Sequence, residues 1–357
     1  MSNDGAVEVS IIVACRNEIN HIRPLLDSML AQDMGGLRWE AIIADGMSDD
    51  GTREVVQEYS SRHPQLRVIA NTARIVSTGL NAAIRMASGM IILRMDAHTL
   101  YAPDYCRACV ETLERTGADN VGGPARARGV GVRARAVAAA YHSRFSTGGA
   151  RFHDVTYEGW VDTLPYGCWH RKALVRLGLF DETLVRNQDD ELNLRLKRAG
   201  GKIWQNPAVV SWYSPRSTLS GLFRQYFQYG FWKVAVIRKH RLPGSWRHVV
   251  PVGFVLTNIF LLAGMALTKA MGTDSWFTGV ASVWLAIGAT YACATFVASI
   301  LVARRQGWSI LGYLPAVFAT FHCSYGLGFV AGLSWYFAKP GSTADLDHLS
   351  VFTRISR

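Results

Sequence analysis

The stretch Ile91-Ile92-Leu93-Arg94-Met95-Asp96-Ala97-His98 decides the fold, because an apolar run of strand length ends directly on an Asp-X-His pair. Side chains two residues apart in an extended segment point to the same side, so Asp96 and His98 can reach a single ion. A carboxylate and a neutral imidazole suit Mg²⁺ or Mn²⁺ better than a structural zinc site. The alternative is a buried strand whose polar end merely begins a turn.

Three further strands are expected before this one. Residues 9–15 form a continuous apolar run, which is typical of a strand covered on both faces. Strands are also expected at 40–44 and 66–70, and helices at 22–30, 52–59 and 80–86. This alternation of strands and helices predicts a mostly parallel sheet with helices on both faces.

Acidic residues follow three of these strands. Open α/β sheets bind ligands outside the carboxyl ends of their strands. Glu18, Asp45 and Asp96 each come after a strand, so we expect them to converge on one crevice. Turn formation explains the glycines of the 45–52 loop, and helix capping explains Asp49–Asp50, but neither explains why acids follow three strands on one rim.

Two later segments carry concentrated charge. Residues 122–152 are rich in Gly, Ala and Arg, and we interpret them as a long connection facing the substrate, with a solvated basic face as the alternative. Asp189, Asp190 and Glu191 stand at the start of an expected helix, where the helix dipole favours acids. Mutual repulsion within such a cluster raises the pKa of at least one carboxyl, which is how a general base is tuned.

The composition changes near His240, where a globular pattern gives way to long apolar stretches. Each stretch reaches the ~20 residues that cross a bilayer. The aromatic and basic segment before them suits a helix in the membrane interface, with packing against the sheet as the alternative. The expected parts are a catalytic domain at 1–220, an interfacial region at 221–248, membrane helices at 249–268, 277–302 and 311–337, and a tail at 339–357.

The formal charge of +11 is carried mostly by arginine. Together with the apolar third of the chain, it indicates an anionic membrane face and phosphorylated substrates, and no nucleic-acid motif is present. Cations before residue 249 and at Arg304–Arg305 should remain on the cytosolic side. The last apolar stretch either spans once, leaving the tail outside, or re-enters and returns the tail to the cytosol. Nothing at the N-terminus resembles a signal peptide, so we expect the first domain in the cytosol.

The motifs in their order resemble the inverting family 2 glycosyltransferases with a GT-A fold. The resemblance rests on Asp45-Gly-X-Ser-X-Asp50-Gly-Thr, on Asp96-Ala-His98, and on Gln188-Asp189 with the trailing Leu192 and Arg195. Two segments followed by a few membrane spans are similar in sequence to bacterial exopolysaccharide enzymes of the succinoglycan glucosyltransferase type. They are residues 186–193 and Gln225-Tyr-Phe-Gln-Tyr-Gly230. The similarity covers nearly the whole chain.

The resemblance implies roles for individual residues. Asp189 matches the catalytic base, Asp45 would contact the donor nucleotide with Glu18 nearby, and Asp96 with His98 would bind a divalent ion, Mg²⁺ or Mn²⁺, on the donor diphosphate. Residues expected on the acceptor or phosphate side are Asp190, Arg195, Gln225 and Tyr226. Two departures stand out: His98 replaces the usual second aspartate, and Gln188 replaces the usual glutamate before the base.

The implied activity is transfer of a single sugar, with UDP-glucose as the candidate donor, to a polyprenyl-diphosphate-linked acceptor at the bacterial inner membrane. The oligomeric state stays open. A polyprenyl-monophosphate sugar synthase is a close alternative, although it needs a base less. A processive synthase is disfavoured because the Gln-X-X-Arg-Trp motif is absent and three spans are few for a pore. A catalytically inactive assembly partner is disfavoured by the complete set of acids.

Overall fold

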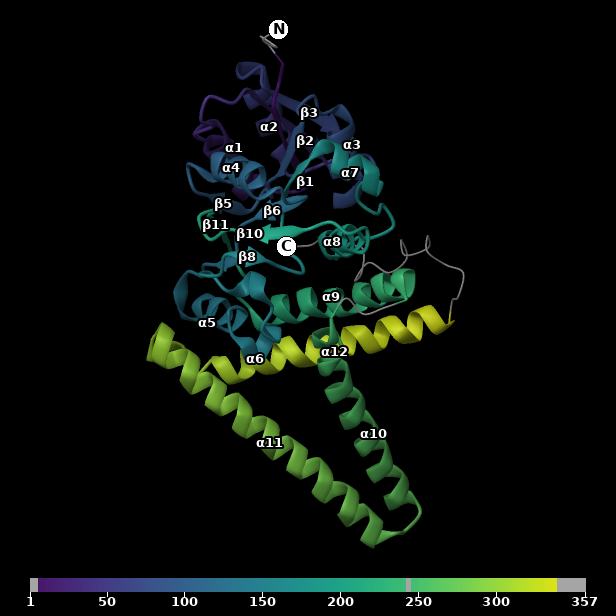
Figure 1. Cartoon of the computed structure of the whole chain (residues 1–357). Helices are drawn as coiled ribbons and strands as arrows, with labels where there is room; N and C mark the ends of the chain where they lie inside the picture. The colour runs from purple at the N-terminus through teal and green to yellow at the C-terminus, as the bar shows by residue number, and fades with distance from the viewer. Residues whose placement is uncertain (1–5, 242–244, 339–357) are drawn as a thin grey trace. The chain divides into compact units, whose positions relative to one another are not determined.

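The computed structural model describes residues 6–241 and 245–338, which fall into two compact units (Figure 1). Unit 1 comprises Met1–Arg126 and Ala150–Ser214, and unit 2 comprises Ala127–Gly149 and Pro215–Arg357. The division lies near the boundary expected at residue 220. It differs in giving residues 127–149 to the unit that carries the apolar helices. The expected tail at 339–357 lies outside the described residues.

Unit 1 is built on an eight-stranded sheet in the order β3-β2-β1-β4-β9-β6-β10-β8. The first four strands pair in parallel, β9 is antiparallel to both of its neighbours, and β8 is antiparallel to β10. A separate three-stranded sheet has the order β5-β11-β7. The strands are β1 Val9–Cys15, β2 Trp39–Asp45, β3 Leu66–Ala70, β4 Ile91–Arg94, β5 Thr99–Tyr101, β6 Asn120–Gly122, β7 Arg126–Ala127, β8 Gly159–Trp160, β9 Cys168–His170, β10 Ile203–Gln205 and β11 Ser211–Tyr213.

Helices cover both faces of the large sheet, as the strand-helix alternation predicted. Successive side chains of β1 point to opposite faces: Ile11 belongs to a core cluster with Leu26 of α1, and Ile12 belongs to a second cluster with Leu80 of α3. All four are fully buried. The helices of unit 1 are α1 Ile19–Leu30, α2 Thr52–Arg62, α3 Val76–Met86, α4 Tyr105–Thr116, α7 Arg171–Leu177 and α8 Gln188–Arg198.

Unit 2 is helical. Its elements are α5 Gly131–Tyr141, α6 Arg144–Thr147, α9 Leu219–His240, α10 Val250–Ala270, α11 Asp274–Gln306 and α12 Leu314–Ala338, with short turns η2 Trp246–His248 and η3 Trp308–Ile310. Among the described residues, three helices are long and apolar enough to cross a membrane, as expected from the sequence: Trp246–Ala270, Asp274–Gln306 and Leu314–Ala338.

The segment at 122–152 is largely helical, so the expectation of a long loop is wrong, whereas its facing the substrate stays a prediction. The alanines of α5 are buried together with residues of α12, so the Ala-rich sequence serves packing. The arginines of the segment are engaged within their own unit: Arg126 donates to the carbonyl oxygen of Pro207 at 2.7 Å, and Arg135 to that of Gln306 at 3.2 Å. Arg133 lies over the ring of Tyr313.

Candidate active site

The carboxyl ends of β1, β2 and β4 lie next to each other at one edge of the sheet. Cys15 at the end of β1 is paired with Asp45 at the end of β2, and Ile12 of β1 is paired with Arg94 of β4. Because these strands are parallel neighbours, the polar residues that follow them are brought to the same rim.

Hydrogen bonds tie together the loops that follow β1 and β2. The backbone N–H of Glu18 donates to Thr52 Oγ1 at 2.8 Å, and that of Ile19 donates to Asp50 Oδ2 at 3.1 Å. The Asn17 amide donates to Asp49 Oδ1 at 2.9 Å. The Asp-rich loop therefore holds the entry to α1 in place, a structural role that capping chemistry predicted in part.

Glu18 and His98 meet at this rim, although they come from different strands. Glu18 Oε1 lies 3.3 Å from His98 Nδ1. Asp45 turns inward: its side chain is 1% exposed, and its carboxylate accepts the Ser48 N–H at 3.2 Å. The structure thus brings Glu18 next to His98, while Asp45 sits at the base of its own turn.

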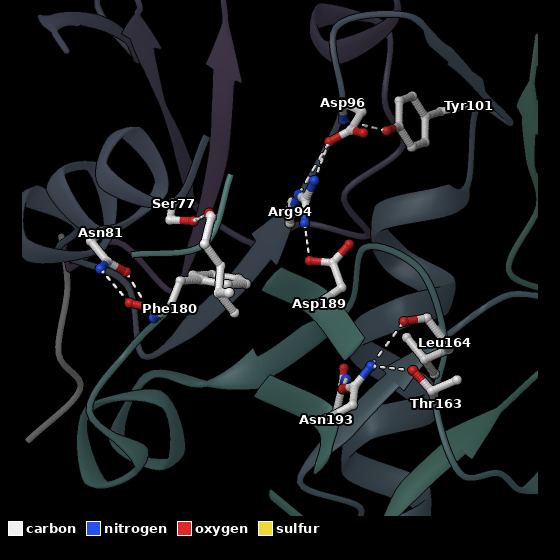
Figure 2. Close-up of polar contacts among 12 residues, drawn as sticks. Ser77, Asn81, Arg94, Asp96, Tyr101, Thr163, Leu164, Phe180, Asp189 and Asn193 are labelled. Atoms are coloured by element: carbon white, nitrogen blue, oxygen red, sulfur yellow. Dashed lines mark hydrogen bonds and ion pairs between the residues drawn. The ribbon is translucent and has the colours of Figure 1, made fainter. Parts of the chain in front are cut away.

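A buried arginine, Arg94, joins two of the predicted site residues (Figure 2). Its guanidinium donates to Asp96 Oδ1 from both Nε and Nη2, at 3.1 and 2.8 Å, and from Nη1 to Asp189 Oδ1. The Arg94 side chain is only 4% exposed. Burial lowers the pKa of Arg94, but the charges of Asp189 and Asp96 outweigh burial and raise it, so the guanidinium stays charged. The predicted base and the predicted metal ligand therefore share one cation.

Asp189 has the electrostatics of a general base near neutral pH. Burial raises the pKa of its carboxyl to about 6; Arg94 opposes this rise, and the negative charges of Asp96 and Asp190 add to it. The side chain nevertheless keeps 26% of its surface exposed, so a substrate hydroxyl can reach it. We had expected repulsion among neighbouring acids to be the main cause, whereas burial is the larger one.

Long-range hydrogen bonds fix the helix that carries Asp189 (Figure 2). Asn193 on α8 is 1% exposed, donates to Thr163 Oγ1 at 2.9 Å and to the Leu164 carbonyl at 3.0 Å, and accepts from the Asn120 amide of β6 at 2.9 Å. The segment before α8 is held by α3, where the Asn81 side chain pairs with the backbone N–H and C=O of Phe180. Asp189 is therefore presented from a fixed helix start.

The acids next to Asp189 differ in their surroundings. Glu191 is fully buried and accepts Nε of Arg195 at 2.8 Å. Arg195 also donates to the backbone carbonyls of Leu177 and Leu179. These contacts give Arg195 a structural role at the end of α7. Asp190 stands half-buried in the first turn of α8.

Gln225 and Tyr226 belong to α9 of unit 2. The Gln225 amide donates to the Tyr229 hydroxyl at 3.1 Å. Tyr226 packs edge-on against Phe321, with ring centroids 4.4 Å apart. Within their unit, these side chains take part in the packing of α9 on α12.

The side chains at the rim fit a divalent ion that is bound together with a diphosphate. His98 Nδ1 is buried and lacks a hydrogen-bond partner in the described part of the chain. Glu18 Oε1 lies 3.3 Å from this nitrogen but does not form a hydrogen bond with it. Across residues 6–241 and 245–338, no three His, Cys, Asp or Glu side chains are grouped to hold a metal. Asp96 and His98 alone are an incomplete set, and oxygens from a diphosphate and water would complete the coordination that Mg²⁺ or Mn²⁺ prefers.

Sequence reasoning missed Arg94 and Asn193. The signal for Arg94 was visible, because an arginine inside an apolar strand has to find a counter-charge when the strand is buried. No comparable signal marked Asn193, whose partners lie 29, 30 and 73 residues away in sequence.

Comparison with known proteins agrees with this geometry. Residues 10–180 match the model of the glycosyl transferase family 2. The succinoglycan biosynthesis protein ExoA of Rhizobium meliloti (strain 1021) is 30% identical over 92% of this chain and 96% of its own length. This chain belongs to glycosyl transferase family 2. The family match covers β1 to β9 and so includes the rim with Glu18, Asp96 and His98, whereas Asp189 lies beyond its end.

Two further relatives extend the family comparison. A dolichyl N-acetyl-alpha-D-glucosaminyl phosphate 3-beta-D-2,3-diacetamido-2,3-dideoxy-beta-D-glucuronosyltransferase of Methanococcus voltae is 26% identical over 91% of this chain and 97% of its own length. The mannosyltransferase PcManGT of Pyrobaculum calidifontis, solved with GDP-Man and Mn²⁺, superposes with a TM-score of 0.58 at 21% identity, covering 88% of this chain and 86% of that one. The predicted GT-A fold of this family 2 glycosyltransferase is thereby confirmed.

Proposed function

We propose that this glycosyltransferase moves one sugar from a nucleotide sugar, with UDP-glucose as the candidate donor, onto a polyprenyl-diphosphate-linked saccharide. Transfer inverts the anomeric centre and serves exopolysaccharide or cell-surface glycan assembly. The observation that carries the proposal is the ion pair between Asp189, a carboxyl of raised pKa at the start of α8, and Arg94 of β4, which also binds Asp96. The full-length similarity to a succinoglycan biosynthesis protein supports the biosynthetic setting.

The chemistry follows from the positions of the carboxyl groups. Asp189 takes the proton of the acceptor hydroxyl as the hydroxyl oxygen forms a bond to the anomeric carbon. The bond from that carbon to the diphosphate oxygen breaks on the opposite face, so the configuration inverts. Arg94 keeps the Asp189 carboxylate oriented, because its guanidinium is itself anchored by Asp96.

Asp96 and His98 would hold the divalent ion, and Glu18 lies 3.3 Å from the imidazole of His98. When bound, the ion offsets the negative charge that develops on the leaving diphosphate. Asp45 and Glu18 remain our candidates for contact with the donor nucleotide. Asp190, Gln225 and Tyr226 remain candidates for the acceptor side.

The enzyme is proposed to lie in the bacterial inner membrane with its catalytic unit in the cytosol, where nucleotide sugars are available. Cations flank the apolar helices on one side: Arg238 and Arg247 precede α10, and Arg304–Arg305 end α11. Positive charges at the ends of membrane helices favour the cytosolic face.

A polyprenyl monophosphate is the competing acceptor. Its phosphate oxygen is already an anion and attacks without losing a proton to a base. A buried carboxyl whose pKa is raised to about 6 would then serve no purpose at the anomeric carbon. Asp189 therefore favours an acceptor hydroxyl.

The test is transfer by the purified full-length protein to two lipids of equal chain length, one a polyprenyl-diphosphate monosaccharide and one a polyprenyl monophosphate. Labelled UDP- and GDP-sugars serve as donors, and Asp189→Asn protein is the matched control. We expect one added sugar on the diphosphate-linked lipid and a large loss in the variant. Transfer to the monophosphate alone, or a ladder of products, would contradict the proposal.

A further inference from the structure

The helices α9 and α12 run side by side in unit 2, and the hairpin of α10 and α11 projects away from them (Figure 1). Contacts between α9 and α12 advance in the same direction along both helices. Tyr226 packs on Phe321 near one end, with ring centroids 4.4 Å apart, and Arg238 lies 5.4 Å above the Tyr336 ring near the other. The two helices are therefore parallel and in contact over ~20 Å, at 1.5 Å per residue.

Glycines allow the two backbones to approach closely. A Cβ atom at Gly230 of α9 would lie 2.1 Å from the Tyr325 carbonyl oxygen of α12. A Cβ atom at Gly328 of α12 would lie 2.0 Å from the Phe227 carbonyl oxygen of α9. Each contact is between backbones, so neither helix can tilt away from the other without losing the pairing. The two helices therefore have similar inclinations to a membrane.

The charges of α9 decide what that inclination is. Arg224 and Arg238 are both exposed and lie ~21 Å apart along the helix axis, which is shorter than the ~30 Å hydrocarbon core. If α9 crossed the bilayer, at least one of these cations would sit in hydrocarbon, which is costly. In the plane of the interface, the same cations meet lipid phosphates.

Burial separates α12 from the other two apolar helices. In the most apolar 18 residues of α12, 50% is buried inside the protein. The corresponding share is 11% for Trp246–Ala270, which contains α10, and 17% for α11. The exposed surfaces of α10 and α11 carry large apolar side chains such as Phe260, Leu262 and Leu285, as lipid contact requires. The apolar sequence of α12 is thus used largely against protein.

We propose that only α10 and α11 cross the membrane, and that α9 and α12 form a paired layer bound to its anionic, cytosolic surface. Two crossings place the chain before α10 and the chain after α12 on the same side. The turn between α10 and α11, with the Lys269–Asp274 ion pair, is then the only part on the far side among residues 6–241 and 245–338. The inference deepens the membrane attachment proposed above but does not depend on the sugar that is transferred.

Cysteine labelling in intact bacterial cells tests the number of crossings. Met271→Cys, 67% exposed in the hairpin turn, and Arg357→Cys at the C-terminus are compared with the parent chain using a membrane-impermeant maleimide. We expect Met271→Cys to react in intact cells and Arg357→Cys to react only after permeabilisation. Reaction of Arg357→Cys in intact cells would mean that α12 crosses, and would overturn the proposal while leaving the transferase assay untouched.

A matched pair of arginine substitutions tests the environment of α12 independently. Leu327 of α12 is 39% exposed and Leu262 of α10 is 49% exposed, and each lies near the middle of its helix. Leu262→Arg should reduce the protein recovered from the membrane several-fold, because the charge must enter hydrocarbon. Leu327→Arg should be recovered at the parental level, since an interfacial side chain reaches headgroups. Equal losses would contradict the in-plane position of α12.

Discussion

Lowering the pH should slow sugar transfer if Asp189 is the base. If its carboxyl must be ionised to accept the proton, a pKa of about 6 makes it about 97% active at pH 7.5 and about 9% active at pH 5. Transfer measured as kcat/KM for the acceptor, which reports the enzyme before the acceptor binds, should therefore fall roughly tenfold between these pH values. A carboxyl at its usual pKa of 3.8 would leave kcat/KM nearly unchanged over the same range.

The assay is single-sugar transfer at saturating donor and metal ion with the acceptor concentration varied, and protein integrity is checked at each pH. Asp189→Asn keeps the size of the side chain and removes its basicity, so its kcat should fall by about 10²- to 10⁴-fold at pH 7.5, with donor affinity nearly unchanged. Asp190→Asn is the matched control, because it removes a neighbouring negative charge and should cost much less. A flat profile down to pH 5, or a fully active Asp189→Asn protein, would refute the assignment.

Three further predictions test other parts of the site. Asp96→Ala should abolish metal-dependent donor binding in calorimetry. His98→Asp should retain more donor binding than His98→Ala, because an oxygen ligand can replace the imidazole. Equal losses in both His98 variants would favour a structural histidine. Arg94→Met should shift the loss of activity on acidification to higher pH, since Arg94 lowers the pKa of Asp189. An unchanged pH profile would mean that Arg94 does not affect the pKa of the base. Ser245→Cys and Ser309→Cys, beside the basic ends of the hairpin, should resist an impermeant label in intact cells, and labelling of either would reverse the proposed orientation.

The central strands could be predicted from sequence because local composition suffices for them. Val9–Cys15 and Leu66–Ala70 were expected with the same bounds that the structure shows. The first is buried on both faces and therefore reads as an apolar run, whereas the second is an edge strand in which only Leu66 is buried. The approach of Glu18 to His98 followed from the parallel pairing of β1 and β4. The strands β6, β8, β9 and β10 escaped prediction, because each has only two or three residues and is defined by partners far along the chain.

What sequence reasoning missed depends on contacts between distant segments. The helix α5 has alanines and arginines without apolar periodicity, and its burial becomes evident only when α12 is present. Likewise, Arg94 and Asp189 are 95 residues apart, so their ion pair exists only in the folded sheet. The sequence grouped Glu191 with Asp189 and Asp190 in one acidic cluster, yet Glu191 is fully buried against Arg195. Asp190 is therefore the better control for Asp189.

The stereochemistry of transfer tests the central claim most directly. A donor with an α-linked sugar is incubated with the full-length protein and the polyprenyl-diphosphate monosaccharide, and the anomeric configuration of the new glycosidic bond is read by NMR. A single displacement assisted by Asp189 predicts a β-linked product. An α-linked product would require retention, and would contradict a mechanism in which Asp189 acts as the base for direct attack by the acceptor hydroxyl.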